Sequence, residues 1–279
     1  MHRINTLLFG PAGAPLSCKT RDSAEGVSQT KKLGLGCMEL EFVRGVRMGL
    51  DKAREVKRQA EQENIVLTAH GPYYINLNSE DKTKIQDSVR RILETARICH
   101  ACGGWSIVFH AAYYMKLEKP AVYSVVKKNL QEIITTLNAE KNAVWIRPET
   151  TGKDSQFGTL QELLQLSQEL ERVMPCIDFS HLHARSNGKF NTYGEFRELL
   201  YAVEKALGKA GLHNMHCHIS GINYGEKGEK NHLNLQESDL NVRAPLMALK
   251  EFDAKGVVIS ESPNIEGDAL YMQKVYAGL

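Results

Sequence analysis

The sequence of 279 residues is poor in cysteine and in long apolar runs. Its six cysteines are scattered, which is too sparse for a disulfide framework and favours a reducing, intracellular compartment. No apolar run approaches the roughly 20 residues that a membrane-spanning helix needs. The opening segment has only four consecutive apolar residues, 7–10, so a signal peptide is not expected. We therefore expect a cytoplasmic protein that does not contact a membrane.

The sequence also lacks an excess of charge of one sign. Lys and Arg number 35 against 33 Asp and Glu, and a net charge of +2 does not by itself indicate a nucleic-acid-binding protein. The hydrophobic share of 42% is ample for a buried core and excludes a disordered or collagen-like chain. No linker or shift in composition divides the chain, so we expect a single domain over 1–279.

Short β-branched runs alternate with segments of helical periodicity along the whole chain. In 120–138, apolar residues recur at steps of three and four, and 81–101 has the same pattern. The eight predicted strands are 4–9, 37–42, 65–69, 105–109, 143–147, 174–178, 214–218 and 256–260. Eight such alternations predict an α/β protein with the (β/α)8 TIM-barrel fold. The alternative is an open doubly wound sheet, which would require a glycine-rich phosphate-binding turn after the first strand. The segment 10–13 is a poor version of such a turn, because Pro11 lacks an N–H.

Side chains that bind metals follow six consecutive predicted strands, the third to the eighth. In a TIM barrel these strand ends form the active-site face, so the side chains should converge. They are His70, His110, Glu149, Asp178 with His181, His218 and Glu261, while His232 lies in the long loop after the seventh strand.

This set offers imidazoles and carboxylates without a thiolate, which suits catalytic Zn, Mn or Fe and not a closed structural zinc site. Any one of these residues, taken alone, is more often an ordinary hydrogen-bonded side chain. A buried set of unpaired carboxylates would be costly, however, and two or three divalent cations would neutralise it. The pattern therefore predicts a multinuclear metal site.

Seven segments of the chain resemble the endonuclease IV family of apurinic/apyrimidinic endonucleases, with similar spacing over nearly the whole length. They are 70–73 (HGPY) with 75–77 (INL), 109–110 (FH), 149–151 (ETT), 176–178 (CID) with His181, 218–220 (HIS) and 261–263 (ESP). His216 lies on the same face of its strand as His218, and the Ile-Ser-Gly that follows His218 makes the latter the matching residue.

The resemblance implies a xylose-isomerase-like barrel with two or three zinc ions, Mn and Fe being alternatives. It assigns His70, His110 and Glu149 to the first ion. Glu149 bridges to the second, which Asp178, His218 and Glu261 complete, and His181 and His232 bind the third. The family has an Asp two residues before the last His, where this chain has Lys230. Glu229 or Glu226 could supply the missing carboxylate, or fewer protein ligands could hold that ion, and we expect Lys230 to point away from it.

The reaction that the resemblance implies is cleavage of double-stranded DNA 5′ to an abasic site, by a monomer, with Glu149 and Glu261 as catalytic residues. Tyr73 matches a residue that enters the duplex at the lesion in this family, and wedges of this kind hold a base stack open. Arg44 and Lys230 are the further candidates for DNA binding. Other basic residues after the strands are candidates for phosphate contact on the same face, and each could equally be a solvated loop charge: Arg47, Lys153, Arg185, Lys189 and Lys227.

Two other functions remain open from the sequence. A sugar isomerase or epimerase on the same barrel uses one ion held by a Glu–Asp–His–Glu set, which Glu149, Asp178, His218 and Glu261 provide. The additional histidines distinguish the nuclease from that enzyme. A metal-loaded lesion-binding module without turnover is favoured only by Lys230.

Overall fold

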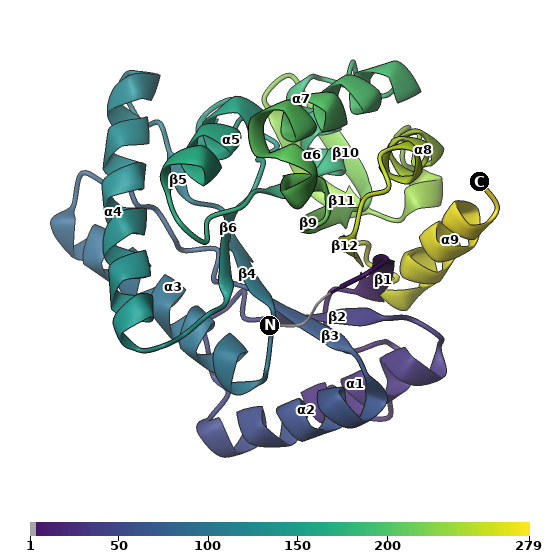
Figure 1. Ribbon diagram of the computed structural model, residues 1–279. Coiled ribbons are helices and arrows are strands. Elements are labelled where there is room, and N and C mark those ends of the chain that lie inside the picture. Colours follow the sequence, from purple (N-terminus) through teal and green to yellow (C-terminus); the bar gives the residue numbers. More distant parts are fainter. Residues whose placement is uncertain (1–3) are drawn as a thin grey trace.

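The computed structural model describes residues 4–279, so residues 1–3 of the predicted domain lie outside the described part. A ring of parallel strands is surrounded by helices (Figure 1). The ring strands are β1 (Leu7–Pro11), β2 (Cys37–Glu41), β3 (Val66–His70), β4 (Ser106–Phe109), β6 (Trp145–Pro148), β8 (Cys176–Asp178), β9 (Met215–Ile219) and β12 (Gly256–Ser260). All eight predicted strands are present, and the predicted TIM-barrel fold is confirmed. The first strand begins three residues later than predicted.

The helices follow the strands in the expected alternation. They are α1 (Ser23–Lys32), α2 (Leu50–Glu63), α3 (Lys82–Ala101), α4 (Lys119–Ala139), α5 (Leu160–Glu169), α6 (Phe179–Arg185), α7 (Tyr193–Leu212), α8 (Arg243–Glu251) and α9 (Glu266–Ala277). The predicted helix 81–101 corresponds to α3, whose N-cap Asp81 accepts a hydrogen bond from the Thr83 amide at 2.8 Å. The predicted apolar stripe of α4 is fully buried.

Short elements on the active-site face complete the structure. The strands β5 (Ala112–Tyr113) and β7 (Gln156–Phe157) pair antiparallel, and β10 (Gly221–Gly225) with β11 (Gly228–Leu233) forms a hairpin before the 3-10 helix η1 (Leu235–Glu237). These elements lie in the loops that follow β4, β6 and β9. They form walls above the barrel mouth.

The barrel strands are hydrogen-bonded as two four-stranded halves, β1-β12-β9-β8 and β2-β3-β4-β6. Isolated parallel bridges join the halves, Ala12 to Glu39 on one side, and Ile146 to Val173 and Glu149 to Cys176 on the other. Two large apolar clusters fill the space between strands and helices, one associated with each half. In residues 4–279, no helix has the length and apolarity that crossing a membrane requires.

Candidate metal centre

The structure brings all eight predicted ligand residues to the C-terminal mouth of the barrel. His70 and Asp178 end their strands, His218 lies in β9, and His110, Glu149 and Glu261 directly follow β4, β6 and β12. His181 comes from α6 and His232 from β11. Strand ends from both halves of the barrel therefore supply the site.

Four groups of potential ligand atoms form in residues 4–279, and within each group the atoms lie within 4.8 Å of one another. Three of them lie at the barrel mouth and are His70–His110–Glu149, Glu149–Asp178–His218–Glu261 and Asp178–His181–His232. The fourth, Cys176–His216–His218, lies nearer the start of β8 and β9. Glu149 belongs to the first and second mouth groups, and Asp178 to the second and third. The mouth groups contain the residues that the resemblance assigned to three ions, and Asp178 is shared in addition.

Glu149 is the centre of the arrangement. Its Oε2 atom lies 3.1 Å from Nε2 of His110 and 3.5 Å from Nε2 of His70. Its Oε1 atom lies 3.1 Å from Nδ1 of His218, which is also 3.3 Å from Oε2 of Glu261. A carboxylate whose two oxygens face separate sets of imidazoles is suited to bridging two cations.

Several buried polar atoms in this cluster lie near one another but make no hydrogen bond of ordinary geometry with the described residues. They include Oε2 of Glu149, Oδ2 of Asp178 and Nε2 of His181. Buried polar groups normally have partners, and buried charges are normally paired or bind metals. The residues present therefore fit divalent metal ions, and the N and O donor set suits Zn, Mn or Fe.

The electrostatics of the cluster point the same way. Burial is the main cause that raises the pKa of Asp178 to about 7. The charges of Glu149 and Glu261 add to this rise in the pKa, whereas the charge of His181 opposes it. Burial opposes ionisation of Glu149 too, but the charges of His110 and His218 outweigh it and hold the pKa of Glu149 well below its ordinary value. A multivalent cation reduces the repulsion among carboxylates that are crowded in this way.

A further carboxylate, Glu229, lies next to the third group, one residue before the position at which the resemblance expected an Asp. Oε2 of Glu229 lies 3.4 Å from Nε2 of His181, while Lys230 is exposed and extends over Gly225. The cause is a bulge in the β10–β11 hairpin, where the register changes between Asn223 and Tyr224 and leaves Lys230 without a counterpart. A bulge changes the alternation of side chains, so Glu229 lies on the His181 side. Glu226, the other sequence-based candidate, is exposed near the hairpin turn.

Sequence reasoning missed Glu39, which lies beneath the cluster and is fully buried. Its Oε1 atom is 2.9 Å from Nε2 of His218, and its Oε2 atom is 3.1 Å from Nε2 of His216 and accepts a hydrogen bond from the Thr68 hydroxyl at 2.7 Å. The period of β2 contained the signal. Met38 and Leu40 of β2, and Phe42 directly after it, pack in the outer core, which turns Glu39 toward the barrel interior.

A cavity of about 440 Å³ opens above the ligands. Tyr73 lines it, is 59% exposed, and has its ring centroid 5.7 Å from that of His70. Arg44 is exposed on the loop after β2 and does not line the cavity. This loop contacts the loop of Tyr73, because the Tyr73 amide donates a hydrogen bond to the Val43 carbonyl. Of the three predicted DNA-binding residues, only Tyr73 therefore borders the metal cluster.

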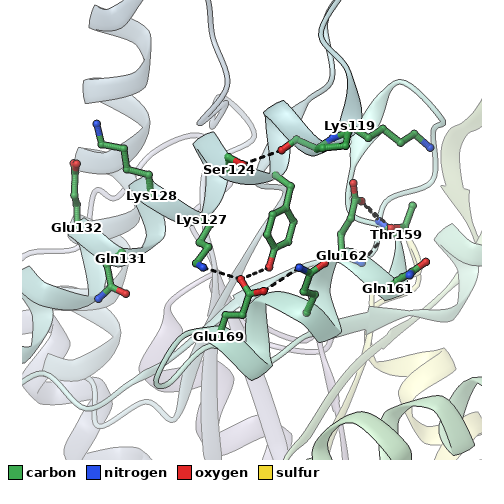
Figure 2. Close-up of a pocket in the computed structure, with 13 residues that line it drawn as sticks. Lys119, Ser124, Lys127, Lys128, Gln131, Glu132, Thr159, Gln161, Glu162 and Glu169 are labelled. Carbon is green, nitrogen blue, oxygen red and sulfur yellow. Dashed lines mark hydrogen bonds and ion pairs between the residues drawn. The ribbon is translucent and has the colours of Figure 1, made fainter.

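A larger groove lies on the flank of the barrel between α4 and α5 (Figure 2). Glu169 of α5 pairs there with Lys127 of α4 at 2.9 Å (Figure 2) and accepts a hydrogen bond from Tyr123 at 2.8 Å. Glu162 forms the capping box of α5. The contacts of Glu169 join the two helices that line the groove.

Comparison with known proteins agrees with this geometry. Residues 27–275 match the family model described as xylose isomerase-like TIM barrel. The chain is 48% identical over 276 residues to "Uncharacterized protein MJ0133" of Methanocaldococcus jannaschii, covering 99% of each chain. It is 26% identical over 196 residues to "Probable endonuclease 4" of Mycoplasma pneumoniae, covering 68% of this chain and 65% of that protein.

Among the solved structures that share the fold are two that are 17% identical to this chain. Endonuclease IV from Thermus thermophilus superposes with a TM-score of 0.71, over 96% of this chain and 98% of that one. A D-tagatose 3-epimerase-like protein superposes with a TM-score of 0.69, over 96% of each chain. The same fold thus occurs in a protein named as an endonuclease and in one named as epimerase-like. This chain is a metal-binding enzyme that belongs to the xylose isomerase-like TIM barrel family.

Proposed function

We propose that the protein is a metal-dependent phosphodiesterase that cleaves DNA 5′ to abasic sites, leaving a 3′-hydroxyl and a 5′-deoxyribose phosphate. The observation that carries the proposal is the number of ligand groups. Of the four groups, the three at the barrel mouth draw on eight residues, and Glu229 adds a ninth carboxylate or imidazole next to His181. Three adjacent cation sites suit a phosphodiester, whose attacking and leaving oxygens both need charge stabilisation. The distant resemblance to proteins named endonuclease 4 supports the same reaction.

Divalent ions in these sites would lower the pKa of a bound water and neutralise charge on the phosphate. The residues of the chain provide positioning. Glu149 and Glu261, both within 3.3 Å of His218, are placed to orient the attacking water for in-line attack on phosphorus. The new P–O bond forms as the bond from phosphorus to the 3′ oxygen breaks, and that oxygen takes up a proton.

The alternative is a sugar isomerase or epimerase that uses one ion. The group Glu149–Asp178–His218–Glu261 is a sufficient site for it, and the epimerase-like structure shares the fold. That reaction gives no role to His70, His110, His181 and His232 together. The number of bound ions therefore separates the two proposals.

The test uses a duplex with one abasic analogue, incubated with metal-loaded protein with and without chelator. We expect a nick at the lesion, no nick in the undamaged duplex, and at least two metal equivalents per chain. Glu261→Gln should abolish cutting and preserve lesion binding, whereas Glu226→Gln, a change at an exposed carboxylate, should cut normally.

Three outcomes discriminate among the proposals. Absence of nicking by fully loaded protein would contradict the nuclease. A single metal equivalent together with epimerisation of a ketohexose would establish the alternative. Tight lesion binding without cutting by the wild-type protein would indicate a binding module.

A further inference from the structure

The loop that follows Glu149 forms one wall of the metal cavity. Its short strand β7 pairs with β5, which sets Gln156 opposite Tyr113, and both residues line the cavity together with Lys153. None of these three belongs to the ligand groups. This wall therefore faces whatever lies over the metal ions.

The wall is held firmly from behind. Arg185 donates from Nη1 to Oγ1 of Thr151 at 2.8 Å and to the Gln156 carbonyl at 3.1 Å. From the other side, the Glu229 amide donates to the Gly152 carbonyl at 3.0 Å. These contacts fix the loop relative to both α6 and the β10–β11 hairpin. The guanidinium of Arg185, a candidate for DNA contact from the sequence, donates its hydrogen bonds to this loop instead.

Gln156 presents an amide without a partner. The residue is only 4% exposed, and its Oε1 atom is buried and makes no hydrogen bond with the described residues. Its backbone is fully used in the loop, and the residue is one of those that line the cavity. Buried amides are almost always hydrogen-bonded, so this group indicates a polar ligand atom at the cavity wall.

Lys153 gives the same wall a positive charge. Among the cavity-lining residues it is the only Lys or Arg, and no carboxylate of residues 4–279 lies within 4.0 Å of its ammonium. The other lining groups are imidazoles, carboxylates, two tyrosines, an asparagine and Gln156. In a cavity that also holds divalent cations, an ammonium is stabilised by an anion that lies between it and the cations.

We propose that Lys153 and Gln156 form the substrate subsite of the metal centre. Lys153 binds a non-bridging oxygen of the substrate phosphate, and the Gln156 amide hydrogen-bonds with an oxygen of the adjoining sugar. The inference rests on the proposed function and makes it more specific, because it requires a phosphate-bearing substrate. A neutral ketohexose would leave the ammonium without a counter-charge.

The experiment measures binding separately from cutting. Wild type, Lys153→Met, Gln156→Met and the control Lys128→Met are compared at equal metal content and equal Tm. Lys128 is a matched control because it lies on α4 in the flank groove (Figure 2). Affinity for inorganic phosphate is measured by calorimetry, and affinity for the abasic-analogue duplex by fluorescence anisotropy over a series of salt concentrations.

We expect Lys153→Met to weaken phosphate binding about tenfold and to reduce the salt slope of duplex binding by about one. Gln156→Met should leave phosphate binding unchanged and weaken duplex binding about tenfold. Lys128→Met should match wild type. Unchanged phosphate and duplex binding in the two subsite variants would overturn the inference, even if the wild type cuts abasic DNA. Loss of phosphate binding in Lys153→Met, in a protein that neither binds nor cuts abasic DNA, would support the subsite and reject the nuclease.

Discussion

Nε2 of His218 lies 2.9 Å from Oε1 of Glu39, while Nδ1 of the same ring faces Glu149 and Glu261. The imidazole thus has one nitrogen directed at a buried carboxylate and the other directed at the ligand cluster. A carboxylate behind a ligating histidine fixes its tautomer and orientation and raises its basicity. Glu39 is in this sense a positioning residue for the second ligand group.

Glu39→Gln should therefore weaken metal binding about 10- to 100-fold, because the amide keeps the shape of the side chain but removes the charge next to His218. Competition with a chromophoric chelator measures the affinity. Asp268→Asn is the control, since Asp268 is also buried but accepts from the Leu235 amide and from Asn264. Equal metal affinity in Glu39→Gln and wild type would remove the positioning role.

Glu229 and Lys230 should respond in opposite ways to substitution. We expect Glu229→Gln to lose one metal equivalent per chain relative to wild type, because it removes the carboxylate 3.4 Å from His181. Lys230→Ala should retain full metal content, because Lys230 lies outside the cluster. Metal analysis after gel filtration gives both results. Loss of an equivalent in Lys230→Ala alone would show that the bulge assignment is wrong.

The third ligand group also depends on the absence of a side chain at Gly152, which packs closely against it. A Cβ at this position would lie 2.7 Å from Cβ of Glu229 and 3.1 Å from Cδ2 of His181. Gly152→Ala should therefore displace Glu229 and weaken binding of one ion, with a loss of about 1–3 kcal/mol in the free energy of unfolding. Gly194→Ala, in α7 with open space around it, should retain all metal and should not lower Tm. Chemical denaturation and metal analysis check both variants.

Tyr73 should contribute to lesion binding and not to metal binding. It is more than half exposed at the rim of the cavity and is not one of the metal ligands. Tyr73→Ala should raise the dissociation constant for the abasic duplex about tenfold, by loss of stacking, at unchanged metal content. Tyr201→Ala, at an exposed tyrosine of α7, is the matched control. If Tyr201→Ala raised the dissociation constant as much as Tyr73→Ala does, a local role of Tyr73 at the lesion would be excluded.

The sequence predicted the barrel well because its signals are local. Most strands are short runs rich in apolar residues, and α4 displays its buried stripe directly in the spacing of its apolar residues. The convergence of the eight ligand residues followed from the rule that barrel strands end at one face. It required no knowledge of individual contacts.

What escaped prediction depends on side-chain direction. Glu39 was overlooked because its neighbours in the sequence are apolar, and its partners His216 and His218 come from a strand far away in the chain. The choice between Glu229 and Glu226 turned on a bulge, and one extra residue in a strand reverses which side chains face the site. The partnerless amide of Gln156 could be recognised only from the packed loop around it.

The division of the barrel into two hydrogen-bonded halves has a mechanical consequence. His70, His110 and Glu149 come from one half, and Asp178, His218 and Glu261 from the other. Cations shared through Glu149 would therefore cross-link the halves across the seam between β6 and β8, in addition to the backbone hydrogen bonds that the Met174 and Thr150 amides donate there. Binding of the ions should slow hydrogen exchange at these two amides.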